Sequence, residues 1–230
     1  MRLSKKKSFN TKRVNILELP IAFEEYQKLS KKELESILMS KYGNNKNFGA
    51  ESKEKKKYLY IKCPKLKSLE GINDSNVSID YVFINNCKNL QDLTGLPDSV
   101  GNLSLENCNF TNLKGCTKQL NVLYIRSCDK LENLIGCPES VNYIFLSNLD
   151  NFKSLEGCPS QLNSLNIREC VNLKSLKYIS PLITGDFSVT FTGLVDLSNG
   201  PKEVGGDYYC NHNNKMKRLN AQDTVMTGHD

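Results

Sequence analysis

The sequence predicts an α/β-type repeat solenoid, with a parallel β-sheet on its concave face and few helices outside an N-terminal helical cap. Three observations support this prediction: a period of 20–24 residues from about residue 58 onward, an alternation of apolar residues inside each unit, and a regular spacing of one anchor position. A unit this short cannot bury its own apolar face, so the units are expected to stack on one another.

The period is clearest in three consecutive units that begin at Leu120, Val141 and Leu162. Each unit has apolar residues or Cys at positions 1, 4, 6, 9, 12 and 15, and in two of them a Leu-x-Gly-Cys-Pro turn follows. The spacing between successive fourth positions is 23, 21, 20, 21, 21, 22 and 21 residues. The fourth positions are Leu59, Val82, Leu103, Leu123, Ile144, Leu165, Phe187 and Tyr208.

Positions 3 to 7 of each unit predict a β-strand with one buried face. Positions 4 and 6 are apolar and their neighbours are polar or aromatic, which is the period of a half-buried strand. We expect the residue at position 9 to turn inward, where an Asn or Cys can sit under the bend. Positions 12 and 15 return to the core, and Gly and Pro close the turn.

Residues Leu120–Leu134 read LNVLYIRSCDKLENL and resemble the leucine-rich repeat, L-x-x-L-x-L-x-x-N/C-x-L. The resemblance covers about residues 58–220 and implies a binding protein of about eight repeats. The Gly-Cys-Pro turns look like the compact repeats of bacterial effector proteins, and residues 200–214 are similar to repeats of tailed-bacteriophage proteins. Tyr178 departs from the pattern at the turn Gly, and Leu149 and Thr192 depart from it at the ladder Cys. No catalytic domain of the effector type is recognisable.

The sequence divides into four segments. Residues 1–19 are expected to form a basic flexible arm, 20–57 a helical cap and linker, 58–220 the solenoid and 221–230 a polar tail. A first repeat exposes the edge of its core, so we expect the 20–42 helices to cover the edge near Leu59. A helix pair that binds a partner is the alternative. The apolar residues that favour these helices include Phe23, Leu34, Ile37 and Leu38.

Positive charge is concentrated before the repeats. Residues 1–57 carry 15 Lys and Arg against 7 Asp and Glu, whereas residues 58–230 carry 16 against 18. The basic runs at residues 5–7, 12–13 and 53–57 could neutralise phosphates, which makes a nucleic-acid-associated protein the alternative function. No aromatic residues are interleaved with these runs, so a solvated arm and linker is the favoured interpretation.

Catalytic and cofactor motifs are not evident. The chain has two His, His212 and His229, no Cys-x-x-Cys pair and no Walker loop, so we expect no enzyme, no metal and no cofactor. The nine Cys follow the repeat and their number is odd. Together with the absence of a recognisable signal peptide, they indicate free thiols in a reducing, cytoplasmic compartment, which is the host cytoplasm if the protein is phage-encoded. No apolar run is long enough to predict a membrane span.

The candidate binding site is the concave face of the sheet, opposite the core. If positions 4 and 6 point inward, the pleat turns positions 3, 5 and 7 outward. Aromatic and Arg side chains there favour a protein partner; contact with a second copy in a homodimer is the alternative. The resemblance to phage proteins extends this to a factor that engages or inhibits a host defence protein. The predicted binding residues are Tyr58, Tyr60, Tyr81, Phe83, Tyr124, Arg126, Tyr143, Phe145 and Arg168.

Overall fold

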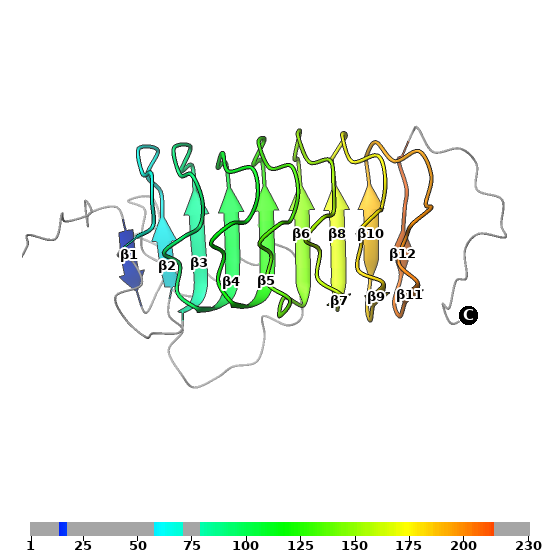
Figure 1. Ribbon diagram of the computed structural model, residues 1–230, viewed down its shortest axis with the longest axis horizontal. Helices are drawn as coiled ribbons and strands as arrows, with labels where there is room; N and C mark the ends of the chain where they lie inside the picture. Colours follow the sequence, from blue (N-terminus) through cyan, green and yellow to red (C-terminus); the bar gives the residue numbers. More distant parts are fainter. Residues whose placement is uncertain (1–13, 18–57, 71–78, 214–230) are drawn as a thin grey trace, which may run out of the picture.

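The computed structural model describes residues 14–17, 58–70 and 79–213, which form a β-solenoid (Figure 1). Its main sheet has nine strands, in the order β1-β2-β3-β4-β5-β6-β8-β10-β12. Strand β1 (Val14–Leu17) pairs antiparallel with β2, and every later pair is parallel. The parallel strands are β2 (Tyr58–Ile61), β3 (Ile79–Asn85), β4 (Ser99–Glu106), β5 (Gln119–Arg126), β6 (Tyr143–Ser147), β8 (Ser164–Arg168), β10 (Phe187–Thr190) and β12 (Tyr208–Tyr209).

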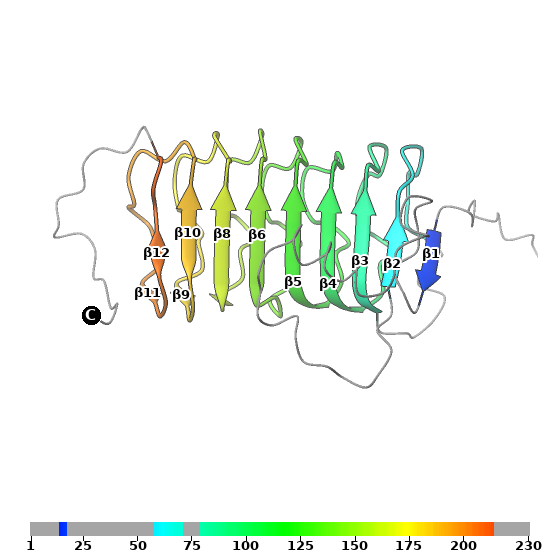
Figure 2. The ribbon, with the colours of Figure 1, turned by 180° about the vertical axis from the view of Figure 1, so that it is seen from behind.

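The strand register confirms the predicted repeat. Every anchor residue is paired with the anchor of the next unit, from Leu59 with Val82 at one end to Phe187 with Tyr208 at the other. Figures 1 and 2 show the resulting row of eight parallel strands from its two sides. The spacing between successive anchors varies from 20 to 23 residues, but the anchors stay paired, so the differences in length lie in the coils that connect the strands.

A second, three-stranded parallel sheet follows the later repeats. It contains β7 (Gln161–Leu162), β9 (Leu182–Ile183) and β11 (Glu203–Val204), in the order β11-β9-β7. In β4 and β5 the corresponding residues belong to one strand of eight residues. In the repeat of β8 a single residue, Asn163, interrupts the strand and divides it in two.

The core lies on one side of the main sheet, as the alternation predicts. The side chains at positions 4 and 6 of β2 to β10 are almost completely buried, for example Leu123, Ile125 and Ile144. The return arm of each coil supplies positions 12 and 15 from the opposite side, such as Leu131 and Leu134, which are fully buried. Because each unit packs its leucines on those of its neighbours, the core runs the length of the array.

A left-handed residue at position 8 makes the bend that ends each strand. Seven successive units from β3 onward have φ between 50° and 62° at this position. Asn occupies three of these positions, which fits because Asn tolerates left-handed backbone better than most residues. The alternation alone does not reveal this bend. The seven residues are Asn86, Asn107, Ser127, Asn148, Glu169, Phe191 and His212.

The bend turns position 9 inward, as predicted, and its side chain joins neighbouring repeats. The Cys108 thiol donates to the carbonyl of Ile84, at position 6 of the preceding unit, over 3.8 Å. Cys128 makes the same contact with Leu105 at 3.7 Å. These buried thiols therefore join the bend of one unit to the strand of the unit before it.

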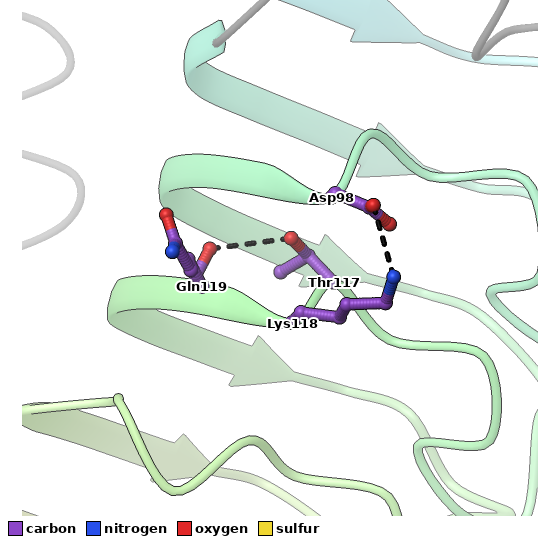
Figure 3. A network of polar contacts seen from close by, with 4 residues as sticks. All are labelled: Asp98, Thr117, Lys118 and Gln119. Atoms are coloured by element: carbon purple, nitrogen blue, oxygen red, sulfur yellow. Dashed lines mark hydrogen bonds and ion pairs between the residues drawn. The ribbon is translucent and has the colours of Figure 1, made fainter. Parts of the chain in front are cut away.

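Side chains also fasten the turn that leads into a strand (Figure 3). The Thr117 hydroxyl donates to the carbonyl of Gln119 at 3.2 Å, and Ser180 does the same to Leu182 at 2.8 Å. Lys118 and Asp98 form an ion pair of 3.0 Å nearby. Because both charged groups are well exposed, this pair adds little stability compared with the two buried hydroxyl contacts.

The N-terminal edge of the main sheet differs from the sequence-based prediction, because an additional strand lies there. Strand β1 forms inside the segment that the sequence predicts to be a basic arm, and it pairs with the first repeat strand through Leu17 and Tyr58. No helix occurs in residues 14–17, 58–70 and 79–213. The predicted helical cap at residues 20–57 and the tail at 221–230 lie outside the described residues.

Candidate partner-binding face

The pleat directs positions 3, 5 and 7 away from the core, as the sequence predicts, and we name this side of the main sheet the outer face. The register aligns position 5 of each strand with position 5 of the next. Position 5 is aromatic in β2 and β3 and again in β5 and β6, so rings lie next to one another in two adjacent pairs of strands. Position 5 reads Tyr60, Phe83, Ser104, Tyr124, Phe145, Asn166, Ser188 and Tyr209.

Several of the predicted binding residues form stacked ring pairs. Tyr124 and Phe145 stack across β5 and β6, with ring centroids 4.5 Å apart and planes at 10°. Phe83 stacks with Tyr60 at 6.1 Å and with Tyr81 at 6.3 Å. Neighbouring strands are separated by about 5 Å, so rings at the same position of successive strands meet in stacking geometry.

The expectation that these rings are exposed is wrong for three of them. Tyr81, Phe83 and Tyr124 are only 7%, 7% and 8% exposed, although their side chains point away from the core. Tyr60, Tyr143 and Phe145 are half-buried. Stacking on neighbours covers the flanks of a ring but not its tip, so pleat direction alone could not predict this burial. Of Tyr58 the structure describes only the backbone.

The two predicted Arg residues are exposed and lie at position 7 of their strands. Arg168 forms an ion pair with Glu169 at 3.0 Å, and its guanidinium lies 5.6 Å from the ring centroid of Phe191. The same ring stacks on His212 at 4.5 Å with an interplanar angle of 8°. Arg168, Phe191 and His212 thus form a column at the end of β8, β10 and β12, which we name the C-terminal column.

Sequence reasoning missed Phe191 and His212 as partners of Arg168. Both lie at position 8, outside the strand positions that pleating assigns to the outer face. Their shared repeat position could have indicated the contact. A left-handed bend that recurs in each unit stacks the side chains at position 8 on one another. Phe191 is 42% exposed and Tyr209, on the adjacent outer face, is 46% exposed.

A carboxylate is buried on the same face. Glu106, at the end of β4, is 9% exposed, and the amide nitrogen Nδ2 of Asn85 donates to its Oε2 at 2.5 Å. The sequence placed this residue among outward polar positions but gave no reason to expect burial. A buried carboxylate is costly unless it is well hydrogen-bonded or paired. The hydrogen bond from Asn85 therefore helps to offset the cost of burying Glu106.

The remaining chemical groups are thiols, and all nine are free. Burial raises the pKa of Cys116 and Cys170 to about 12 and that of Cys158 to about 11. A hydrogen bond with Cys128 is the main cause that raises the pKa of Cys108 to about 12. These thiols are therefore protonated and weakly nucleophilic near neutral pH. Among the described residues no group of three or more His, Cys, Asp or Glu is arranged to hold a metal ion.

The raised thiol pKa values predict a loss of stability in alkali. In the unfolded chain these thiols ionise near their ordinary pKa of 9.0, whereas in the folded chain they stay protonated to higher pH. The unfolded state therefore releases protons first, and the free energy of unfolding should be constant below about pH 8 and fall as the pH rises from about 9 toward 12. Urea denaturation at several pH values measures this.

A Cys170→Ala variant is the control for this pH dependence. It removes one ionisable thiol, so its stability should decline less steeply above about pH 9 than that of the wild type, even though it is less stable throughout. Equal slopes for the two proteins would contradict the assignment.

No protein-family model, curated protein or solved structure matches this chain. Within the described residues no helix is long and apolar enough to cross a membrane.

Proposed function

We propose that this protein is a non-enzymatic binding module of the leucine-rich-repeat type and that its partner is another protein, bound on the outer face of the sheet. The observation that carries the proposal is the exposed aromatic and Arg surface at the C-terminal end of the array, where the outer face meets the bends that follow β10 and β12. There Arg168, Phe191 and His212 form a column beside Tyr209.

The position-9 ladder supports the repeat type. In the leucine-rich-repeat pattern this position is Asn or Cys. Here Cys87, Cys108 and Cys128 donate to the position-6 carbonyl of the preceding unit, and Asn213 donates to the equivalent carbonyl of Val189 at 2.8 Å. Cys and Asn, the two residue types that the pattern allows at position 9, thus both donate a hydrogen bond to the preceding unit.

The chemistry of the accessible surface favours a protein partner over a nucleic acid. Aromatic and Arg side chains are enriched in the energetically dominant centres of protein interfaces. Residues 58–230 carry 16 basic against 18 acidic residues, so the solenoid lacks the strongly positive surface that phosphate binding requires. The accessible half runs from β6 to β12, because the outer positions of β3 to β5 are largely buried.

The resemblance of residues 200–214 to bacteriophage repeats extends the proposal to the setting. The partner would then be a protein of the bacterial host, including a defence protein, which the phage factor engages or inhibits. This extension rests on family analogy rather than on a residue of the site.

The test is a pull-down from bacterial lysate with three forms of the full chain: wild type, Arg168→Glu/Tyr209→Asp and Ile135→Asp. Ile135 is 44% exposed on a return arm, so its variant is a matched control for an exposed apolar change away from the sheet. We expect the double variant to lose a retained protein by at least about tenfold and the control to keep it.

Circular dichroism first establishes that all three forms are folded. Equal retention by all forms would contradict binding on the C-terminal half of the outer face. Retention that requires nucleic acid, and that collapses steeply with added salt, would favour the basic N-terminal residues instead.

A further inference from the structure

The burial of rings on the outer face of β3 to β5 needs an explanation that the solenoid itself does not supply. Tyr124 shows this most clearly. Its hydroxyl oxygen is the side-chain atom farthest from the strand, yet this atom is buried. The described return arms lie on the core side of the sheet, and the neighbouring ring of Phe145 stacks against the flank. Something must therefore lie over the tip.

The burial is concentrated on β3, β4 and β5. Six of their nine outer positions are 9% exposed or less, including Val122 at 3% and Ser104 at 6%, whereas Asn85 and Asn102 are half-buried and Arg126 is exposed. On β6 the outer rings are half-buried, and on β12 Tyr209 is 46% exposed. Strand β12 is an edge strand, but β8 and β10 are not, and their outer residues Asn166 and Ser188 are also only half-buried. The cover therefore lies over β3 to β5, since Tyr60 on β2 is also only half-buried.

The same strands are rich in additional interactions. Beyond the ring pairs and the Asn85–Glu106 hydrogen bond, outer-face residues of β2 to β6 each take part in at least one further hydrogen bond, ion pair, ring contact or electrostatic interaction. They include a cation and a carboxylate as well as rings. These residues are Tyr60, Lys62, Tyr81, Phe83, Glu106, Tyr124 and Tyr143.

We propose that the occupant of this face is residues 18–57 of the same chain. Leu17 ends β1 directly opposite Tyr58, which begins β2. The 40 residues between them therefore leave and re-enter the sheet at adjacent points on its edge. From β2 to β5 is three strand spacings, about 15 Å, a distance that a segment of this length covers easily.

The composition of residues 18–57 matches the face that it would cover. The segment contains apolar residues at helical spacing, among them Leu34, Ile37 and Leu38, which suit a surface of stacked rings. It also carries 9 Lys and 7 Glu. Its Lys residues can approach Glu106 and its Glu residues can approach Lys62, so both buried rings and charged groups would find partners of the right chemistry.

The other segments outside the described residues fit less well. Residues 1–13 have six Lys and Arg among thirteen residues, which is unsuitable for covering rings. Residues 71–78 are eight residues held at both ends beside β3, and Tyr124 lies two strands away. Residues 214–230 follow β12, and would have to cross β8 to β12, whose outer positions remain half-open.

Photo-crosslinking of the full chain tests the proposal. Benzoylphenylalanine is placed at Tyr124, where it preserves an aromatic ring, and at Tyr209 as the exposed control. After irradiation, mass spectrometry maps the peptide joined to each site. We expect the Tyr124 probe to join residues 18–57 within a monomer and the Tyr209 probe not to do so. A Tyr124 product in a covalent dimer, in residues 1–13 or 214–230, or with no protein partner would overturn the proposal.

Hydroxyl-radical footprinting provides a second measurement that does not depend on the probe. In the wild type, Tyr81, Phe83 and Tyr124 should be oxidised at least about tenfold more slowly than Tyr178, which is 51% exposed. The variant Ile37→Asp/Leu38→Asp should raise oxidation at Tyr124 by about tenfold and leave Tyr178 unchanged, whereas Ile135→Asp should change neither. Equal labelling of Tyr124 in the wild type and the double variant would count against residues 18–57 as the cover.

Discussion

Replacing Gly136 by Ala should unfold the solenoid locally and lower the free energy of unfolding by at least about 3 kcal/mol. Gly136 has φ of +95°, which L-residues adopt only with strain. A Cβ atom there would lie 2.5 Å from the carbonyl oxygen of Leu113 and 2.6 Å from its carbonyl carbon. Because these are backbone atoms of the preceding repeat, no rotamer change relieves the clash, and the two units must move apart.

The neighbouring unit repeats this arrangement, since Gly157 would place a Cβ 2.4 Å from the backbone of Leu134. Urea denaturation followed by circular dichroism measures the effect of Gly136→Ala. An unchanged midpoint would show that the coils can separate at little cost, and would contradict close backbone contact as the reason for the Gly.

The matched control is Tyr178, which takes the turn position of its own unit with φ of 70°. Its side chain is 51% exposed and contacts the ammonium group of Lys177. The change Tyr178→Gly removes left-handed strain but increases the freedom of the unfolded chain, so stability should be unchanged or rise by about 1 kcal/mol. A substantial loss of stability would mean that the ring itself holds this turn.

Asn213→Ala should cost about 3 kcal/mol and free the last strand, β12, from the array. The Asn213 side chain is 8% exposed and makes four hydrogen bonds. Its Oδ1 accepts from the backbone N–H and the hydroxyl of Thr192, at 2.8 and 2.7 Å. Its Nδ2 donates to the carbonyls of Val189 and Cys210, both at 2.8 Å. Ala would leave all four partners without this bond in a largely dry site.

Asn211→Ala is the control, because Asn211 is an exposed Asn two residues earlier. Its loss should change stability by no more than about 0.5 kcal/mol. Amide hydrogen exchange distinguishes the two variants: Asn213→Ala should accelerate exchange in β10 and β12 and leave β4 and β5 protected, because a solenoid loses terminal units first. Uniform acceleration along the whole array would contradict an end-localised role.

Strand register was predictable because the repeat encodes it many times. Eight anchors at nearly equal spacing leave one way to stack the units, and a slip of one residue would place every buried Leu on the wrong face. The direction of the side chains followed from the pleat for the same reason. The inward turn at Cys108 and Cys128 was predictable from the pattern, but the left-handed bend at Asn107 and Ser127 that produces it was not, because many residue types occupy that position.

The direction in which the side chains of the candidate site point was predictable, but their exposure to solvent was not. Tyr124 and Phe145 face away from the core and stack, as their shared position implies. Whether such a ring meets water depends on what lies above the sheet, and no local pattern carries that information. The C-terminal column was missed because Phe191 and His212 lie in bends, where side chains come together only through the stacking of units.

Local pattern alone was enough to specify the pairing of β2 to β12 and the inward set of side chains, because neighbouring repeats carry the same apolar periodicity. Tertiary structure alone decided that β1 closes the first edge, that Tyr81, Phe83 and Tyr124 are covered, and that Glu106 is buried. The physical reason is that these features depend on contacts between parts of the chain that share no periodicity, so burial there is set by the folded neighbours of a residue rather than by its place in a repeat.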